Sequence, residues 1–358
     1  MGDALTRLHW HPPHPLQTSF VFLSRSSVDH SNASKPRRRA LKVISALPAA
    51  IVLAACSERR QPMLVASHVW PGYELMFLAQ REGWLDTQLV GLIDTQSATQ
   101  SMQALEGRQV DAAALTLDET LILVDRGVDL RVVLVFNLSS GADAVLGKPG
   151  VGSLAEIAGK RVGVEDTAVG ALMLHKMLDA AGLSADAIEV VPLTIDQHLD
   201  AWQAGTVDVL VSYEPVAGVL LRQGASLLFD SSAIPDKILD VLAIRAEVLD
   251  TRHGRRATSA LIDAHFQALQ HLQRNPADAG YRLAQRLGTT GPEALQSYRG
   301  LVLPDEYANR RLLSSGGVKR ATTAVSQILL EQGRVSSATS VDLADARFLP
   351  RANRGTHP

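Results

Sequence analysis

Apolar runs of strand length alternate with helix-like patterns along the chain from residue 61 onward. The clearest of these runs, Val207–Pro215, is mostly apolar and then ends in Tyr213, Glu214 and a proline. Such a run is typical of a buried parallel strand, which carries its last side chains to the carboxyl edge of a sheet. Open α/β sheets bind ligands at that edge, so we expect Tyr213 and Glu214 to lie in a ligand site.

A weaker copy of this unit occurs earlier in the chain, where the apolar run Val110–Leu115 is followed by Thr116. Thr116 and Glu119 have the spacing of a capping box at the start of a helix, so Glu119 is predicted to be a cap. Asp118 has no capping role in this pattern. It either faces a ligand cleft or is a solvated acid favoured by the helix dipole. Two similar units predict two similar lobes.

Two aromatic residues, Trp70 and Tyr73, lie in the loop after the first predicted strand, Met63–Ser67. Proline and glycine between them end the strand, and the pattern of a helix follows. Aromatic side chains in such a loop often wall a ligand cleft, because each offers a large rigid face and a polar tip. The alternative is that they pack beneath the loop.

A nearly all-apolar strand, Arg131–Phe136, runs into the polar and turn-rich segment Asn137–Asp143. A chain that leaves a buried strand through such a segment is predicted to cross to a second lobe. The backbone amides around Gly141 and the Ser140 hydroxyl would then be free to bind a ligand, beside the acid Asp143.

A long helix, Ala168–Ala181, follows the predicted strand Arg161–Val164 and stops at Gly182. Thr167 is placed to be its N-cap. The start of the helix presents free amides and a partial positive charge, so Thr167 and its neighbours are also a candidate seat for a carboxylate or sulfonate. The two roles are compatible.

The last part of the chain is predicted to return to the first lobe through a strand at Val241–Ile244 and then to become helical from Thr258 onward. His198 lies one turn inside an earlier predicted helix. We interpret this lone histidine as a surface or packing residue and not as a ligand.

The composition is that of an ordinary soluble protein, with 46% apolar and 20% charged residues in a chain of 358, which is long enough for two domains. The net charge of −2 gives no basic surface for nucleic acid. The single cysteine excludes an intramolecular disulfide framework. We expect no metal site, no cofactor and no catalytic residue.

That cysteine, Cys56, closes a stretch with the features of an export signal. The basic segment Lys35–Arg39 precedes a short apolar stretch, Ala40–Ala55, and polar residues follow. The stretch is too short and too interrupted for a spanning helix. It resembles the lipobox of bacterial lipoproteins, in which the cysteine is lipidated and becomes the mature N-terminus; the alternative is an uncleaved helix with a chance cysteine.

The export route stays open, because Arg37–Lys42 is similar to a twin-arginine signal but has alanine where that family favours phenylalanine. Residues 1–34 show no periodicity and are interpreted as a leader or a misassigned start.

Several of these signals, taken in order, resemble the substrate-binding lipoproteins of bacterial ABC importers for nitrate, sulfonate and taurine. The resemblance covers roughly residues 62–335. It rests on the following segments: Trp70–Tyr73, Gly107 with Val110–Asp111, Ser139–Asp143, Gly159–Glu165, Val207–Asp208 with Tyr213–Pro215, and Asp230–Ser232 before Pro235.

The resemblance implies an α/β protein with the two-lobed type II periplasmic-binding-protein fold, each lobe a mixed sheet flanked by helices with the ligand cleft between them. Residues 1–56 would be leader and lipoprotein signal, residues 62–140 plus 237–345 lobe one, residues 141–236 lobe two, and residues 346–358 a loose tail. The cleft positions are Trp70, Tyr73, Thr116, Asp118, Ser140, Gly141, Asp143, Thr167, Tyr213 and Glu214.

The function implied is capture of a small sulfonate, taurine-like or other nitrogen-bearing solute by a monomer that is lipid-anchored at Cys56 on the periplasmic or cell-surface side of the membrane. Its partners would be an ABC permease and its ATPase. Acids in the cleft, Glu214 above all, favour a solute that carries a donor over nitrate itself. The alternatives are a binding protein or enzyme for the thiamine pyrimidine precursor, which have the same fold, and a binding lobe that serves a sensor.

Overall fold

The strands of the first sheet come from both ends of the folded chain. The computed structural model describes residues 61–339 and 341–351, within the unit Ser57–Pro358. The first sheet has the strand order β11-β4-β10-β3-β1-β2. Its strands are β1 (Met63–Ser67), β2 (Val90–Asp94), β3 (Ala112–Thr116), β4 (Leu130–Ser139), β10 (Leu239–Arg245) and β11 (Leu301–Val302). β10 is antiparallel to both of its neighbours, β3 and β4.

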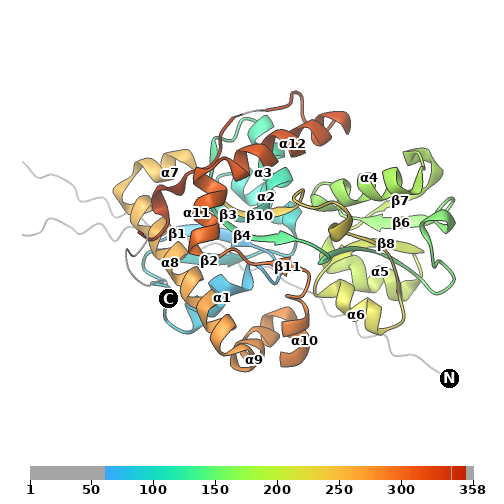
Figure 1. Cartoon of the computed structure of the whole chain (residues 1–358), viewed down its shortest axis with the longest axis horizontal. Coiled ribbons are helices and arrows are strands. Elements are labelled where there is room, and N and C mark those ends of the chain that lie inside the picture. The colour runs from blue at the N-terminus through green and yellow to red at the C-terminus, as the bar shows by residue number, and fades with distance from the viewer. Residues whose placement is uncertain (1–60, 340, 352–358) are drawn as a thin grey trace, which may run out of the picture. The chain divides into compact units, whose positions relative to one another are not determined.

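The second sheet is built from one continuous part of the chain and has the order β7-β6-β8-β5-β9. Its strands are β5 (Asp143–Gly147), β6 (Arg161–Val164), β7 (Glu189–Pro192), β8 (Val209–Tyr213) and β9 (Ser226–Asp230). The chain passes from β4 directly into β5, and it returns from β9 to β10. The two sheets therefore lie side by side and share two connections (Figure 1). We call the parts of the chain around the first and second sheet lobe one and lobe two.

The two sheets repeat one arrangement, as the two similar units of the sequence predict. β3 and β8 each lie between a parallel and an antiparallel neighbour. An aspartate precedes each strand and accepts a hydrogen bond from the adjacent parallel strand. Asp111 Oδ2 accepts from the Leu64 amide at 2.8 Å, and Asp208 Oδ2 accepts from the Arg161 amide at 3.0 Å. Thr116 and Tyr213 consequently occupy matching strand ends.

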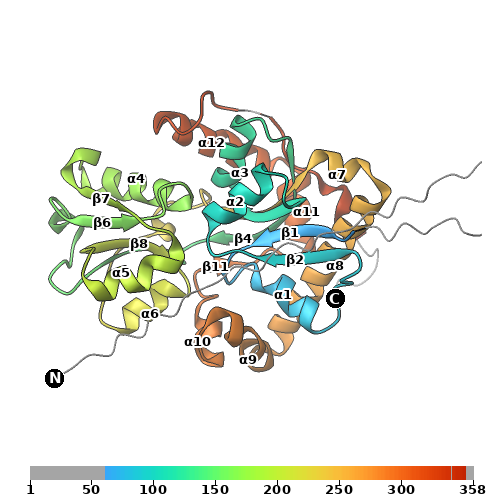
Figure 2. The ribbon, with the colours of Figure 1, turned by 180° about the vertical axis from the view of Figure 1, so that it is seen from behind.

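Helices cover both sheets. Those of lobe one are α1 (Glu74–Arg81), α2 (Ala98–Glu106), α3 (Leu117–Asp125), α7 (Ala246–Asp250), α8 (Arg252–Arg274), α9 (Pro276–Leu287), α10 (Gly291–Gln296), α11 (Glu306–Ser314) and α12 (Gly317–Glu331). Those of lobe two are α4 (Val169–Ala181), α5 (His198–Ala204) and α6 (Val216–Arg222). Seen from behind, α2 and α3 lie on the side of lobe one that faces α4 (Figure 2). No helix among the described residues is long and apolar enough to cross a bilayer.

The largest core lies around the first sheet because its middle strands are apolar along their whole length. All five residues of β3 are buried. Helix α8 packs an apolar stripe that includes Leu261, Leu269 and Leu272 against this core. Lobe two has a smaller cluster on each face of its sheet. Burial on both faces is what long apolar strands require.

β4 is longer than the sequence predicts, since it continues past Phe136 to Ser139. The polar residues that suggested a turn are tolerated in the strand because they find buried partners. Asn137 binds Asp240, and Ser139 Oγ lies 2.8 Å from Ser231 Oγ at the second connection.

The C-terminal segment is also better packed than expected, so the prediction of a loose tail over 346–358 is wrong for its described part. Phe348 and Leu349 are buried in the core of lobe one, and Arg310 donates a hydrogen bond to the Pro350 carbonyl. Two apolar side chains in a short polar segment gave too weak a pattern to predict this docking. Residues 352–358, like the predicted leader and signal, lie outside the described residues.

A buried ion pair joins the start of α1 to the end of α9. The Arg286 guanidinium donates to the Glu74 carboxylate, which is 1% exposed, and it also lies 3.6 Å from the centre of the Phe77 ring. Burial raises the pKa of Glu74 to about 7, although Arg286 acts in the opposite direction. Glu74 thus depends on Arg286 for compensation of its lost hydration.

Replacing Arg286 by alanine should therefore destabilise the protein by roughly 3–5 kcal/mol, the usual cost of leaving one partner of a buried pair alone. Chemical denaturation followed by circular dichroism measures this change. Arg256→Ala, on an exposed position of α8, is the matched control and should stay within about 0.5 kcal/mol of the wild type. Equal stability of the two variants would contradict the role given to the pair.

Candidate functional site

A small cavity lies where the strand ends of the two sheets meet. Its volume is about 10 Å³, which is room for one water-sized sphere. Both lobes line it, with the residues His68, Trp70, Tyr73, Thr116, Glu119, Asp143, Val169, Tyr213 and Asp240. Any solute larger than a water molecule therefore requires the lobes to move apart before it can enter.

The loop after β1 is fixed by a hydrogen-bonded network centred on Asp240. Tyr73 donates its hydroxyl hydrogen to Asp240 Oδ1 at 2.6 Å, and Asn137 Nδ2 donates to Asp240 Oδ2 at 2.6 Å. Asn137 Oδ1 in turn accepts from the Trp70 indole at 3.0 Å. Gly72 permits this arrangement, because a Cβ at that position would lie 1.8 Å from Asn137 Oδ1. The network sets the positions of both aromatic rings of the loop.

Four rings surround the cavity, and they come from both lobes. The Trp70 and Tyr213 rings meet edge to face with centroids 5.5 Å apart, and the His68 and Tyr73 rings do so at 5.3 Å. Trp70, Tyr73 and Tyr213 are each less than a tenth exposed. Their faces give a solute a rigid apolar enclosure with few polar tips.

Glu119 joins the two lobes through a single carboxylate. Its Oε2 accepts from the Thr116 amide at 2.9 Å, which is the capping interaction predicted from the sequence. Its Oε1 accepts from the amide of Val169, the first residue of α4 in lobe two, at 3.2 Å. Glu119 is therefore more than a cap, since it also occupies the start of a helix in the opposite lobe.

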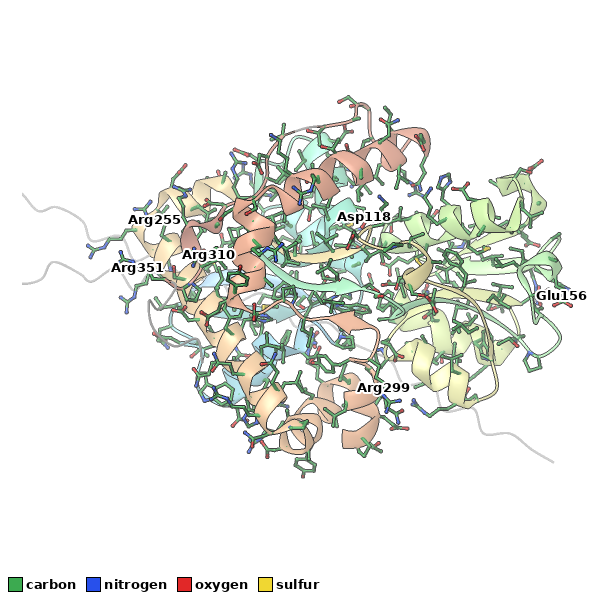
Figure 3. The ribbon with its side chains drawn as sticks, in the orientation of Figure 1. Asp118, Glu156, Arg255, Arg299, Arg310 and Arg351 are labelled. Atoms are coloured by element: carbon green, nitrogen blue, oxygen red, sulfur yellow. The ribbon has the colours of Figure 1, made fainter. Side chains whose placement is uncertain are left out.

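Carboxyl groups are concentrated around this cavity. Asp118, Glu119, Asp143, Glu165 and Asp240 are all buried. Loss of hydration is the main cause that raises the pKa of each. The pKa of Asp143 rises to about 7, with the charge of Asp118 adding to the effect. Figure 3 shows Asp118 where lobe one faces lobe two, and Glu156 at the outer end of lobe two.

The lining has no basic side chain that is charged near neutral pH. The described residues that form it include neither lysine nor arginine. His68 is the single imidazole among them, and burial, together with the charge of Arg286, lowers its pKa to about 3. His68 is thus neutral at physiological pH, and the cavity wall is acidic.

Several buried polar atoms at this site have no hydrogen-bond partner within the described residues. The unpartnered atoms of the lining are His68 Nδ1, Thr116 Oγ1, Asp143 Oδ2 and the Tyr213 hydroxyl. Just behind it, both oxygens of Asp118 and Glu165 Oε2 are also without a partner. Buried polar groups in folded proteins are nearly always paired, so a cluster of exceptions marks a place where a ligand supplies the partners.

The structure brings together five of the ten predicted cleft residues in the lining. These are Trp70, Tyr73, Thr116, Asp143 and Tyr213. Asp118 lies next to them, buried, and its charge acts on Asp143 and Asp240. The alternative of a solvated Asp118 is therefore wrong.

Ser140, Gly141 and Glu214 lie outside the lining. The Ser140 amide donates to the Gly300 carbonyl at 2.7 Å, and the Gly141 amide donates to Ser231 Oγ at 2.6 Å. The expectation that these amides are free to bind is wrong, because the connection between the lobes uses them. Glu214 is half-buried and accepts from the Gly218 amide at 3.3 Å. Its carboxylate is held at the start of α6 and is not part of the cavity lining.

Thr167 is not the N-cap of α4, which is Ala168. Its side chain is exposed, and its hydroxyl lies 2.5 Å from that of Thr99 in lobe one. The predicted anion seat at this helix start is also taken, because the Glu119 carboxylate already accepts from its first amide. An acidic side chain does lie at the N-terminus of α4, where the helix dipole favours an acceptor, but the protein supplies it.

Sequence reasoning missed Asp240, Asn137 and His68 as parts of the site. Asp240 gave a usable signal, since it is a lone carboxylate in the otherwise apolar strand β10. The sequence pattern places Asn137 in a turn-rich segment and gives no sign of its role in the site. His198, in contrast, is a packing residue as expected: it is buried, with Nδ1 lying 3.1 Å from Ser212 Oγ.

Three further contacts connect the lobes around the cavity. Thr99 donates both its amide, at 2.9 Å, and its hydroxyl to Glu165 Oε1. Arg222 of α6 lies 3.2 Å from Glu293 of α10. Arg334, beyond α12, donates to the Asp166 carbonyl.

Within the described part of the chain, no group of histidine, cysteine and acidic side chains has the arrangement of a metal site.

The residues of this site fall within a recognised family, since the NMT1-like family matches residues 68–288. The chain belongs to the NMT1-like family. That match runs from the residue after β1 to the end of α9 and includes every residue that lines the cavity. None of the curated proteins matches the sequence.

Solved structures with the same fold include several binding proteins. The alkanesulfonate-binding protein SsuA from Xanthomonas axonopodis pv. citri, bound to MOPS, has a TM-score of 0.67 and 18% identity, covering 79% of this chain and 97% of its own. The aliphatic sulphonate binding protein SsuA from Escherichia coli has a TM-score of 0.63 and 17% identity, covering 81% and 99%. The nitrate-binding protein NrtA from Synechocystis PCC 6803 has a TM-score of 0.60 and 11% identity, covering 78% and 83%. The two-lobed periplasmic-binding-protein fold expected from the sequence is confirmed.

Gly72→Ala should disturb the site through the network around Asp240. The added methyl group would overlap Asn137 Oδ1, so we expect a loss of roughly 1–3 kcal/mol in the free energy of unfolding from this overpacking. The indole of Trp70 should also shift, which changes its fluorescence. Gly152→Ala is the matched control, because its nearest atom would lie at an ordinary 3.8 Å. A Gly72→Ala protein as stable as this control would show that the close approach is not required.

Proposed function

We propose that this protein is the extracytoplasmic solute-binding component of an ABC importer, which captures a small nitrogen-bearing solute between its lobes and presents the closed form to a permease. The observation that carries the proposal is the cluster of unpartnered buried polar atoms from both lobes around one cavity. The family match and the fold of its structural neighbours agree with this role.

Capture by lobe closure follows from how the site is divided. Trp70, Tyr73 and Thr116 belong to lobe one, whereas Asp143 and Tyr213 belong to lobe two. Neither lobe alone can surround a solute. A solute that touches both lobes stabilises the closed state over the open one, and the permease can then distinguish filled from empty protein by shape. The protein does no chemistry on the solute in this mechanism.

A sulfonate or nitrate fits this site less well than a nitrogen-bearing solute. The predicted anion-seating groups, Thr167 and the amides near Ser140, are exposed or already bonded within the protein. Apart from Thr116 and Val169, the groups that do line the cavity are aromatic or acidic. In their ionised form these acids accept hydrogen bonds from donors and repel bare anions. The thiamine pyrimidine precursor, which carries amino groups, stays compatible with the site as an alternative solute.

The position of the protein in the cell follows from Cys56, which we propose is lipidated and tethers the mature chain to the membrane. The support for this is the sequence pattern alone: a basic segment, a short apolar stretch and small residues before the cysteine. One acyl chain gives weak attachment, so stable tethering would use more than one, as bacterial lipoproteins do.

A disulfide between positions 99 and 167 should lock the lobes. The Thr99 and Thr167 hydroxyl oxygens lie 2.5 Å apart, close to the roughly 2.05 Å of an S–S bond. In a Cys56→Ala chain, the Thr99→Cys, Thr167→Cys variant should form this bond on oxidation. Amide hydrogen exchange of residues 68–73 should then become at least about tenfold slower. Release of the co-purified solute, measured by native mass spectrometry, should slow by a similar factor.

Reduction should restore both rates, and Thr99→Cys alone, the control, should behave as the unmodified chain. If exchange and solute release were equally fast in the oxidised and reduced double variant, the lobes would not open at this cavity, and the proposal of capture by closure would be wrong.

Labelling of growing cells with radioactive palmitate tests the lipid anchor. We expect the wild-type protein to be labelled and to sediment with membranes, and the Cys56→Ala protein to be unlabelled, because the thioether bond to the lipid requires this sulfur. Equal labelling of the two proteins would contradict the anchor. Retention of an intact precursor by the variant would in addition show that cleavage depends on Cys56.

A further inference from the structure

Two of the carboxyl groups at the cavity already accept hydrogen bonds from fixed donors of the protein. Asp240 accepts from Tyr73 and Asn137, each at 2.6 Å. Glu119 accepts from two backbone amides. These acids hold the architecture of the site, and the hydrogen bonds that they accept leave them little capacity for a ligand.

Asp143 and Asp118 differ from these two acids. Asp143 lines the cavity and Asp118 lies next to it. Asp143 Oδ2 and both oxygens of Asp118 are unpartnered, although the two residues are only 3% and 1% exposed. Asp143 starts β5, opposite Tyr213 of β8, and so approaches the cavity from lobe two, whereas Asp118 lies in the first turn of α3 in lobe one. One group bound between the two acids would therefore contact both lobes.

We infer that the solute is a small organic cation, an ammonium or amidinium compound, whose charge is bound by Asp143 with Asp118 behind it and whose body lies against the Trp70 and Tyr213 rings. This inference rests on the proposed function. Aromatic faces attract cations through their quadrupole. The neutral His68 Nδ1 and the Thr116 hydroxyl accept the remaining N–H hydrogens of the same group. A metal ion is a poorer occupant, since the described residues offer no set of metal-binding side chains with suitable geometry.

Capture of such a cation is linked to protons. The groups that act on Asp143 are Asp118 from α3, Asp240 from β10, and the Tyr213 and Ser139 hydroxyls. The groups that act on Asp118 are the Thr116 hydroxyl, the amides of Asp118 and Glu119, and Arg334 from beyond α12. With burial as the main cause, the pKa of Asp143 rises to about 7. Below that pH the free protein holds this proton, and a bound cation must displace it. Affinity for a cation should therefore be highest above pH 7 and fall as the pH is lowered.

The test compares ligands that share a carbon skeleton and differ in charge. Two trios serve as probes: acetamidinium, acetamide and acetate, and benzamidinium, benzamide and benzoate. Taurine, methanesulfonate and nitrate complete the panel. We expect the amidinium of at least one trio to raise the melting temperature of the full chain and to bind by calorimetry, while its neutral and anionic partners do not. No binding by either amidinium, or equal or tighter binding of an amide or an anion, would overturn the inference.

Calorimetry of the bound amidinium between pH 5 and pH 8 should show affinity rising about 100-fold with pH, as loss of one proton with a pKa near 7 requires. Titrations in buffers of different ionisation enthalpy should show release of about one proton per cation below pH 7.

Asp143→Asn should weaken binding about 10- to 100-fold and flatten the pH profile. A flat or falling profile in the wild type would overturn the inference.

The melting temperature of Asp143→Asn distinguishes a loss of binding from a loss of folding. Removing a buried carboxyl group that lacks a partner should leave the melting temperature of Asp143→Asn equal to or above that of the wild type. Asp200→Asn, at an exposed position of α5, is the matched control and should bind as the wild type does. If an anion binds and the disulfide of the Thr99→Cys, Thr167→Cys variant slows its release, the cation inference fails and the proposed function stands. If this disulfide changes neither solute release nor amide exchange, the proposed function fails.

Discussion

The buried carboxyl groups at the lobe boundary lose hydration without gaining a basic neighbour in the cavity wall, and much of the structure depends on how this cost is offset. For Asp240 and Glu119 the protein provides hydroxyl, amide and backbone donors, and these same donors fix the aromatic loop and the contact between the lobes. For Asp143 and Asp118 it provides almost none. Burial of unpartnered acids is unfavourable for folding, and its concentration at one cavity is the pattern expected when stability is given up for ligand binding.

The contacts that hold the lobes together are few and mostly polar. Arg222 and Glu293 form a partly exposed ion pair, and such pairs contribute little to stability. Thr99 and Glu119 add hydrogen bonds to the segment of lobe two just before and at the start of α4. A boundary of this kind separates two states by a small free energy, so the contacts made by one solute are able to shift the balance between them.

The fold could be predicted from the sequence because its signals are local. Apolar runs such as Val207–Pro215 and stops such as Gly182 are governed by side chains close in sequence, and they place the strand ends Thr116 and Tyr213 correctly at the cavity. The site could be predicted only in part. Asn137 and Asp240 are 103 residues apart, and only the packed sheet shows that they are partners. Thr167 and Ser140 lie outside the lining, and a helix start or a turn does not reveal whether the protein bonds its own donors.

The return of the chain through β10 has a consequence for how the molecule is made. Lobe two has a sheet built from one continuous segment, so its strands can all pair as soon as that segment is available. The first sheet has to wait for β10, which lies between β3 and β4 and also carries Asp240. Pairing over such sequence distances is slow. The aromatic loop therefore gains its anchor late in folding, and the acidic cavity is among the last features of the protein to form.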